Sequence, residues 1–224
     1  MVYTESFSAP PLNLREAMRY GGMAGAGEDM ERRVRGVYDE ISDKLCYRVC
    51  CGEFEIAQCG DVLDLGFMKT DSRGLMKNLR GCGSIVLFAA TVGIELDRYI
   101  AMYGVTEPHK SLIAQAIGAE RIESLCDVFS DKIEAEAKSR GLYTRPRFSP
   151  GYGDFPLGAQ REIFKVLDCP RKIGLTLNQS MLMSPSKSVT AIIGLSKEPK
   201  NCGRIGCSSC ENTDCSFRSE EYQE

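Results

Sequence analysis

A segment rich in proline and glycine, Thr144–Leu157, constrains the fold of this chain more than any other stretch. It reads T-R-P-R-F-S-P-G-Y-G-D-F-P-L and combines three prolines with two glycines. Proline fixes φ and pushes the residue before it into extended geometry. Glycine permits positive φ and lets the backbone approach a ligand closely. The segment is therefore predicted to be a stiff, shaped loop, and neither a helix nor a regular strand.

The same loop carries groups that suit a ligand with a carboxylate and a flat ring. A turn between two helices is the ordinary interpretation of such a cluster. A mere connection, however, does not require a guanidinium, an aromatic ring and a carboxylate packed around two glycines. We therefore interpret the loop as a ligand-binding candidate. Its candidate site residues are Arg147, Pro150, Gly151, Tyr152 and Asp154.

The composition favours a globular protein with a substantial core. The chain has 224 residues, of which 43% are hydrophobic and 26% charged, enough for one domain or one domain with an appendage. A net charge of -3 gives no reason to expect a nucleic-acid partner. The longest apolar run, Ile85–Ala90, has the length of a strand rather than of a membrane span. Without the pattern of a signal peptide at the start, we expect a cytoplasmic protein that does not bind membranes.

His109 is the only histidine, and this excludes several kinds of site. A zinc or iron centre with several histidine ligands is impossible. No G-x-S-x-G motif is present to support a serine nucleophile. The D-x-H-x-x-G pattern, by which many corrinoid proteins ligate cobalt, is also absent. The chain is therefore not expected to hold cobalamin as its own ligated cofactor.

Helical and strand patterns alternate along the chain without a clear βαβ repeat. This predicts an α+β fold with a mostly antiparallel twisted sheet and flanking helices. Helices are expected from residue 13 to a break at 21, from 28 to about 45, from 72 to about 81, at 109–139 and at 158–167, and strands at 47–55, 62–67, 85–90, 173–177 and 188–195. The predicted organisation is a flexible arm at 1–11, a main domain at 12–197 and a cysteine-rich tail at 198–224.

The loop also resembles a known family. Arg147–Tyr152, R-F-S-P-G-Y, fits the R-x-x-x-G-Y motif of the S-adenosylmethionine-binding activation domain of cobalamin-dependent methionine synthase. Upstream, Gly83–Gly93 looks like the family's apolar strand that ends in a Thr-Gly turn, and the long helix after it has the family's placement. Downstream, Leu182–Val189 looks like its Pro-x-x-Ser-Val segment. The similarity covers roughly residues 83–196 and is weaker over 12–82.

The resemblance implies the same α+β fold and assigns ligand-binding roles to Arg147, Gly151 and Tyr152. Arginine matches a carboxylate with two parallel hydrogen bonds, and a tyrosine ring against a sulfonium contributes about 1 kcal/mol. Asp154 lies outside the motif, and we expect it to take the ligand's ammonium or ribose hydroxyls. A surface salt bridge is the alternative for Arg147, and Arg145 is its competitor for the carboxylate. The acidic residue that the family uses from its N-terminal region has no counterpart that can be placed here.

The function that this resemblance implies is reactivation of a corrinoid enzyme. The chain is expected to bind S-adenosylmethionine and to dock, as a free-standing subunit, on methionine synthase or a related corrinoid-binding methyltransferase. An electron donor such as flavodoxin then supplies one electron, and the methyl group traps the reduced cobalt of the partner's cobalamin. In such a methyltransferase system the chain positions the donor and is not catalytic alone. A reactivator of a different corrinoid protein remains an alternative.

The chain has eleven cysteines, an odd number that speaks against a disulfide framework. Four of them lie close together in a polar tail, and such thiolates can enclose a zinc ion or a small iron–sulfur cluster. These are Cys202, Cys207, Cys210 and Cys215. A disordered tail of reduced thiols is the alternative, and a metal-binding interaction or redox protein is the corresponding alternative function. The other seven cysteines are interpreted as small buried hydrophobic residues.

Overall fold

The computed structural model describes residues 1–199 and has an antiparallel five-stranded sheet at its centre. The strand order is β1-β2-β6-β10-β7, and each neighbouring pair is antiparallel. The strands are β1 (Tyr3–Phe7), β2 (Tyr47–Glu55), β6 (Cys82–Thr91), β10 (Ser188–Ser196) and β7 (Tyr143–Thr144). The middle strand β6 is buried along most of its length, as its uninterrupted apolar sequence requires. The predicted α+β class with a mostly antiparallel sheet is confirmed.

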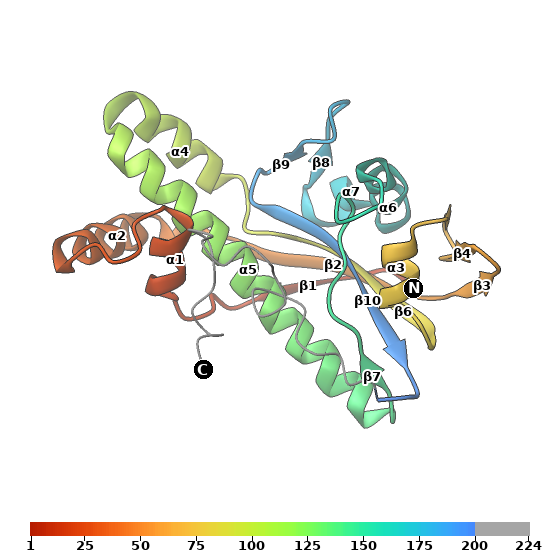
Figure 1. Cartoon of the computed structure of the whole chain (residues 1–224). Coiled ribbons are helices and arrows are strands. Elements are labelled where there is room, and N and C mark those ends of the chain that lie inside the picture. Colours follow the sequence, from red (N-terminus) through yellow and green to blue (C-terminus); the bar gives the residue numbers. More distant parts are fainter. Residues whose placement is uncertain (200–224) are drawn as a thin grey trace.

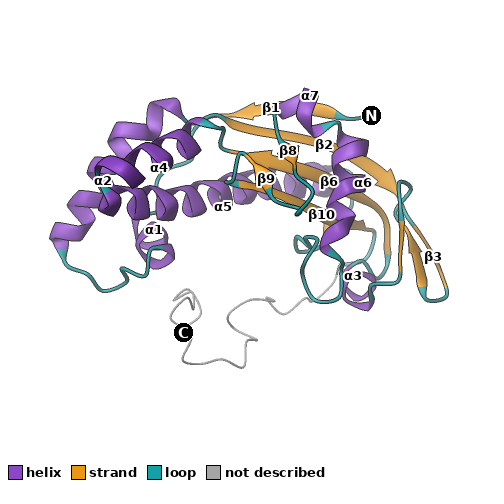
Figure 2. Ribbon diagram, turned by 90° about the horizontal axis from the view of Figure 1, so that it is seen from above, coloured by secondary structure: helices purple, strands orange, loops and turns teal. Residues whose placement is uncertain are grey.

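One face of the sheet packs against the long helix α5 (Pro108–Ser139). Figure 1 shows α5 crossing the sheet, and Figure 2 shows α1 (Leu14–Tyr20), α2 (Glu28–Ile41) and α4 (Glu95–Thr106) gathered at one end of it. A 3-10 turn, η1 (Ser42–Lys44), follows α2. On this face the rings of Phe88 and Phe129 lie 4.8 Å apart between centroids. Because Pro108 stands in the first turn of α5, where its missing N–H is harmless, the helix begins there.

The opposite face of the sheet packs against a group of short helices. They are α3 (Arg73–Asn78), η2 (Leu157–Ala159), α6 (Gln160–Leu167) and α7 (Cys169–Ile173). Side chains alternate along a strand, so Leu87 belongs to this cluster whereas its neighbour Phe88 belongs to the α5 side. Phe155, at the end of the proline-rich loop, is also buried here.

The remaining strands form two small sheets at the periphery. One has the order β3 (Ala57–Cys59), β4 (Val62–Asp64) and β5 (Lys69–Thr70), and the other pairs β8 (Thr176–Leu177) with β9 (Met183–Ser184). The strands predicted at 62–67 and 173–177 are therefore shorter than expected. Within 1–199, no helix is both long and apolar enough to cross a membrane.

The N-terminal segment corrects the prediction of a flexible arm at residues 1–11. Tyr3–Phe7 forms strand β1, which pairs with β2, and Phe7 packs edge-on against the Phe129 ring. Arg121 of α5 is fully buried and donates to the carbonyl oxygens of Pro10 and Pro11. The strand is short and polar in sequence. Its pairing depends on partners that are far away in the chain, which explains why local patterns did not indicate it.

The cysteines of the described part divide into two groups. Cys50, Cys51, Cys126 and Cys169 are buried, as predicted for small hydrophobic residues, but Cys46 and Cys59 are exposed and Cys82 is half-buried. The four cysteines of the predicted metal site lie outside the described residues. That site and the domain boundary at 197/198 therefore stay predictions.

Candidate functional site

The loop at 144–157 begins as an extension of the sheet beside β10. The Arg145 N–H donates to the Gly194 carbonyl oxygen over 2.8 Å, and Phe148 exchanges two backbone hydrogen bonds of 2.9 Å with Ile192. Extended backbone sends successive side chains to opposite faces. Arg147 therefore points toward α5, whereas Phe148 packs with Phe155 on the other face, with ring centroids 6.3 Å apart.

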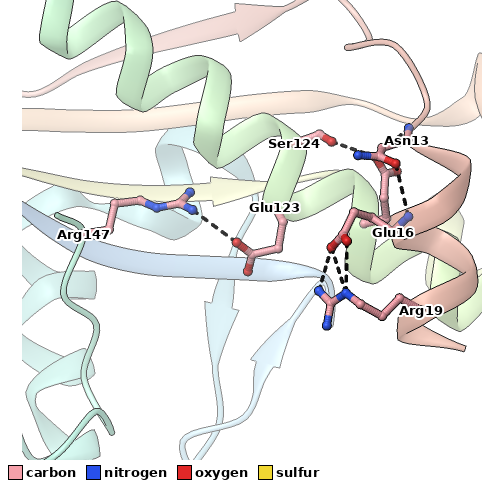
Figure 3. A network of polar contacts seen from close by, with 7 residues as sticks. Asn13, Glu16, Arg19, Glu123, Ser124 and Arg147 are labelled. Atoms are coloured by element: carbon pink, nitrogen blue, oxygen red, sulfur yellow. Dashed lines mark hydrogen bonds and ion pairs between the residues drawn. The ribbon is translucent and has the colours of Figure 1, made fainter. Parts of the chain in front are cut away.

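Arg147 faces two carboxylates on α5. Its Nη2 donates to the Glu123 carboxylate over 3.3 Å (Figure 3) and to the Asp127 carboxylate over 2.8 Å. Its Nη1 is buried and has no hydrogen-bond partner by geometry among residues 1–199, and the guanidinium also lowers the pKa of the buried Cys126 thiol against the larger effect of burial. A buried guanidinium donor without an acceptor is costly. An acceptor such as a ligand carboxylate would satisfy Nη1 only after the side chains that cover it move.

Glu123 lies between Arg147 and helix α1. Burial raises the pKa of Glu123, and the nearby charge of Asp127 adds to the effect, whereas Arg147 and Arg19 oppose it. Tyr20 of α1 lies close by, since the charge of Glu123 contributes to the raised pKa of Tyr20, after burial as the larger cause. Figure 3 shows the Glu16–Arg19 ion pair of α1 on the side of Glu123 away from Arg147. Charged groups of α1, α5 and the loop thus lie around the Glu123 carboxylate.

Neither Glu123 nor Asp127 was singled out from the sequence. Charged residues on an amphipathic helix ordinarily form its solvated face, so the pattern gave no signal for a site. Only the pairing of residues 144–148 with β10 brings Arg147 against this part of the helix.

Two glycines shape the second half of the loop. Gly151 and Gly153 have φ values of 90° and 53°, a region that favours glycine. The Gly151 N–H donates to the Phe155 carbonyl oxygen over 2.8 Å, and Pro150 is buried beneath the turn. The Tyr152 side chain projects outward and is 70% exposed. An exposed ring next to a turn of this kind is available to cover the flat part of a ligand.

Asp154 anchors the loop to α3. Its carboxylate accepts hydrogen bonds from the Ser72 hydroxyl over 2.6 Å, from the Arg73 N–H over 2.7 Å and from the Gly74 N–H over 3.0 Å. These bonds, led by that of Ser72, lower the pKa of Asp154. A Cβ atom at Gly74 would lie 2.9 Å from the Asp154 carboxylate oxygen, so the close approach requires glycine. Both carboxylate oxygens are already engaged within the protein. The predicted contact with a ligand's ammonium or ribose stays a prediction.

Arg145, the predicted competitor of Arg147, does not face the acidic pair. It is buried, and its side chain lies beside Gly194 on the face opposite to α5. There it donates to the Glu198 carbonyl oxygen over 3.1 Å. Strict alternation would place Arg145 and Arg147 on one face, but the stretch 145–148 has one residue more than the stretch 192–194 that it pairs with, and this breaks the alternation. Arg147 is therefore the arginine of this loop that is positioned with Glu123 and Asp127.

The described part of the chain holds no cluster of three or more histidine, cysteine or acidic side chains arranged to bind a metal ion. This finding concerns residues 1–199 and does not test the four tail cysteines. The candidate site therefore consists of an arginine, two carboxylates, the backbone of a glycine turn and an aromatic ring. Such a set suits an organic zwitterion with a ring.

Comparisons with known proteins agree with the fold. Residues 76–213 match the family model described as vitamin B12 dependent methionine synthase, activation domain. A solved structure entitled "Crystal Structure of the MetH Reactivation Domain bound to AdoHcy" superposes with a TM-score of 0.65 at 17% identity. The superposition covers 89% of this chain and 80% of that one. No curated protein matches the sequence.

The family match includes the loop with Arg147, Gly151 and Tyr152 and spans more than half of the chain. The structural likeness extends to the elements on both faces of the sheet, since it covers most of the chain. The chain therefore belongs to the family of the activation domain of vitamin B12-dependent methionine synthase.

Proposed function

We propose that this protein binds S-adenosylmethionine at the loop of Arg147 and supports reductive remethylation of the cobalamin of methionine synthase or a related corrinoid methyltransferase. Family membership and the likeness to a reactivation domain bound to AdoHcy support this function. The observation that carries it is the Arg147 guanidinium, which stands at the start of the glycine turn and faces Glu123 and Asp127.

The amino-acid end of S-adenosylmethionine matches these charges. Its carboxylate pairs with the Arg147 guanidinium, a group that favours carboxylates. Its ammonium pairs with Glu123, which lies next to the same guanidinium. The Arg147–Glu123 ion pair is partly exposed, and such pairs contribute only about 0–1 kcal/mol. The ligand therefore replaces this pair at little cost.

The turn after Arg147 provides for the rest of the ligand. Gly151 has no side chain, so its backbone can approach the edge of the adenine. The Tyr152 ring covers the adenine or faces the sulfonium, a cation–π contact of about 1 kcal/mol. Asp154 supports the same turn, because its carboxylate accepts backbone hydrogen bonds from the N-terminus of α3.

The chain's contribution to methyl transfer is positioning. The sulfonium is an activated methyl donor, and the acceptor is the reduced corrinoid of a partner protein, so no general base is required from this chain. Binding the donor in a fixed orientation reduces the entropic part of the barrier. The proposal includes a corrinoid-binding methyltransferase as partner, an electron donor such as flavodoxin, and action in the cytoplasm.

Calorimetric titration of S-adenosylmethionine into the wild-type protein and Arg147→Ala tests this function. We expect the wild type to bind and the variant to lose at least about tenfold in affinity, because a charge-assisted hydrogen bond contributes about 1.5–3 kcal/mol. Arg140→Ala is the matched control. Arg140 also pairs with a glutamate, but it lies at the C-terminus of α5, away from Glu123 and Asp127. Equal affinity of the wild type and Arg147→Ala would refute the assignment of the loop.

A further inference from the structure

Two cysteine sulfurs meet in the core on the face of the sheet opposite to α5. The Sγ atoms of Cys50 and Cys169 lie 3.9 Å apart, although the residues are 119 positions apart in the chain. Cys50 stands on β2, opposite Ala89 of β6, and Cys169 is the first residue of α7. Both side chains are fully buried. Neither residue belongs to the loop at 144–157 or to the ion pair on α5.

The two thiols differ in their electrostatic surroundings. The neighbouring Cys169 thiol lowers the pKa of Cys50 against the effect of burial, and the Ala89 backbone and the charge of Lys172 act in the same direction as Cys169. For Cys169, the adjacent Cys50 and burial both raise the pKa. The thiolate is the reactive form of cysteine, and the contact between the two sulfurs couples the ionisation of one thiol to that of the other.

The next residue of β2 provides a contrast within the same strand. Cys51 is equally buried, but it points to the face that packs against α5. Burial raises the pKa of Cys51 to about 11. Cys50 and Cys51 are therefore adjacent buried cysteines with the same backbone environment, and Cys50 is the one that contacts Cys169.

We propose that Cys50 and Cys169 are a reversible redox-modification site that forms a disulfide with a small hydroperoxide. Local opening of the short helix α7 admits the peroxide to the buried pair. The thiolate of one cysteine attacks one peroxide oxygen, the O–O bond breaks, and that cysteine becomes a sulfenic acid while the other oxygen leaves as water after taking a proton. The sulfur of the second cysteine then attacks the sulfenic sulfur, and the S–O bond breaks with release of a second water. In total, the two thiols lose two electrons and two protons, and hydrogen peroxide is reduced to two molecules of water.

The geometry requires a small closure only. A disulfide has an S–S distance of about 2.05 Å, so the two sulfurs need to approach each other by about 2 Å from their present contact. β2 is held between β1 and β6, whereas α7 is a helix of five residues that packs on the sheet. Formation of the bond therefore draws α7 toward β2. It also restrains α6, which lies between η2 at the end of the ligand loop and α7.

Peptide mapping of the full-length protein after hydrogen peroxide treatment tests this proposal. After acid quenching, free thiols are alkylated in denaturant and the protein is digested with trypsin. The sequence places Cys50 in the peptide 49–69 and Cys169 in the peptide 166–171. We expect a cross-linked pair of these peptides, with fragmentation that places the bond at Cys50, and its disappearance after dithiothreitol.

Cys50→Ala and Cys169→Ala are each expected to abolish the cross-linked pair, and Cys51→Ala is expected to retain it. If Cys50→Ala fails to fold, Cys50→Ser and the wild-type map still provide the test. The proposal is wrong if Cys50 and Cys169 remain alkylated as completely as Cys126 after peroxide treatment. It is also wrong if Cys50 accumulates as a sulfinic acid without any link to Cys169.

Discussion

At the scale of single residues, the site depends on one arginine that is shared between the protein and the proposed ligand. Arg147 follows from the R-x-x-x-G-Y motif, but its acidic neighbours follow from packing alone. The Glu123 side chain is 44% exposed and that of Asp127 67%. Burial is the largest cause of the raised pKa of Glu123, so its protonation is expected to begin above the usual range of a glutamate.

Replacing Glu123 with glutamine is expected to weaken S-adenosylmethionine binding by roughly 10–150-fold, since a hydrogen bond to a charged group contributes about 1.5–3 kcal/mol. In the wild type, affinity should fall as the pH drops through the raised pKa of Glu123, because the protonated acid no longer attracts the ligand's ammonium. In Glu123→Gln this part of the pH dependence should vanish. Calorimetry over a pH series measures both effects, and an unchanged affinity would exclude Glu123 from the site.

The hydrogen bonds of Asp154 are expected to make the stability of the protein depend on pH. Its folded-state pKa is lowered by Ser72, Gly74 and Arg73. Its contribution is therefore present above the unfolded pKa, about 3.9, and is lost as the pH falls through the folded value. We expect Asp154→Asn to unfold at a lower temperature than the wild type near neutral pH, with a difference that shrinks in acid. Thermal unfolding over a pH series tests this, with the exposed Asp71→Asn as control. A difference that does not change with pH would argue against the carboxylate.

At the scale of elements, the ligand loop is positioned because it continues the sheet at its edge. Its first half pairs with β10 and its second half is tied to α3, so two elements define where Arg147 and Tyr152 point. The close packing behind this junction centres on Gly194. A Cβ atom there would lie 2.6 Å from Leu79 Cδ2, 2.7 Å from Cys82 Sγ and 3.1 Å from Arg145 Cγ.

Gly194→Ala is therefore expected to lower the free energy of unfolding by about 1–3 kcal/mol, the usual cost of an overpacked core. The three neighbours come from different parts of the chain and cannot all move in one direction. Gly36→Ala is the matched control. Gly36 lies on an exposed face of α2 with nothing within 4 Å of an added Cβ atom, so alanine should stabilise the helix by about 0.5–1 kcal/mol. Denaturant unfolding measures both, and equal effects would contradict the packing argument.

At the scale of the whole molecule, a buried charge fastens the N-terminal strand to the rest of the domain. Arg121 of α5 is fully buried and pairs with Glu120 as well as with the carbonyl oxygens of Pro10 and Pro11. Glu120 in turn accepts the N–H of Asn13, the residue that caps α1. β1, α1 and α5 are thus joined through a single polar cluster.

We expect Arg121→Ala to lower the free energy of unfolding by about 3–5 kcal/mol, because it leaves a buried carboxylate without its partner. Arg140→Ala removes a half-exposed ion pair and should change stability by less than about 1 kcal/mol. Denaturant unfolding compares the two variants. Similar values for both would mean that the N-terminal strand is held by its pairing with β2 rather than by Arg121.

Several features of this protein were determined by its sequence alone. The alternation of apolar residues specified the long helix α5 and the central strands β2, β6 and β10, because such periodicities need only short-range information. The prolines and glycines of 144–157 specified a loop, since they restrict φ wherever they occur. The motif in that loop indicated Arg147, Gly151 and Tyr152, and with them the family.

The tertiary structure alone decided which side chains meet. It placed Glu123 and Asp127 against Arg147, and Arg145 on the opposite face of the sheet. It also placed the Asp154 carboxylate at the N-terminus of α3, where it accepts backbone hydrogen bonds. It also converted the N-terminal segment into a strand. The physical reason is the same in each case. Whether a charged residue on a helix is solvated or part of a site depends on the element packed against it, and that element comes from a distant part of the chain.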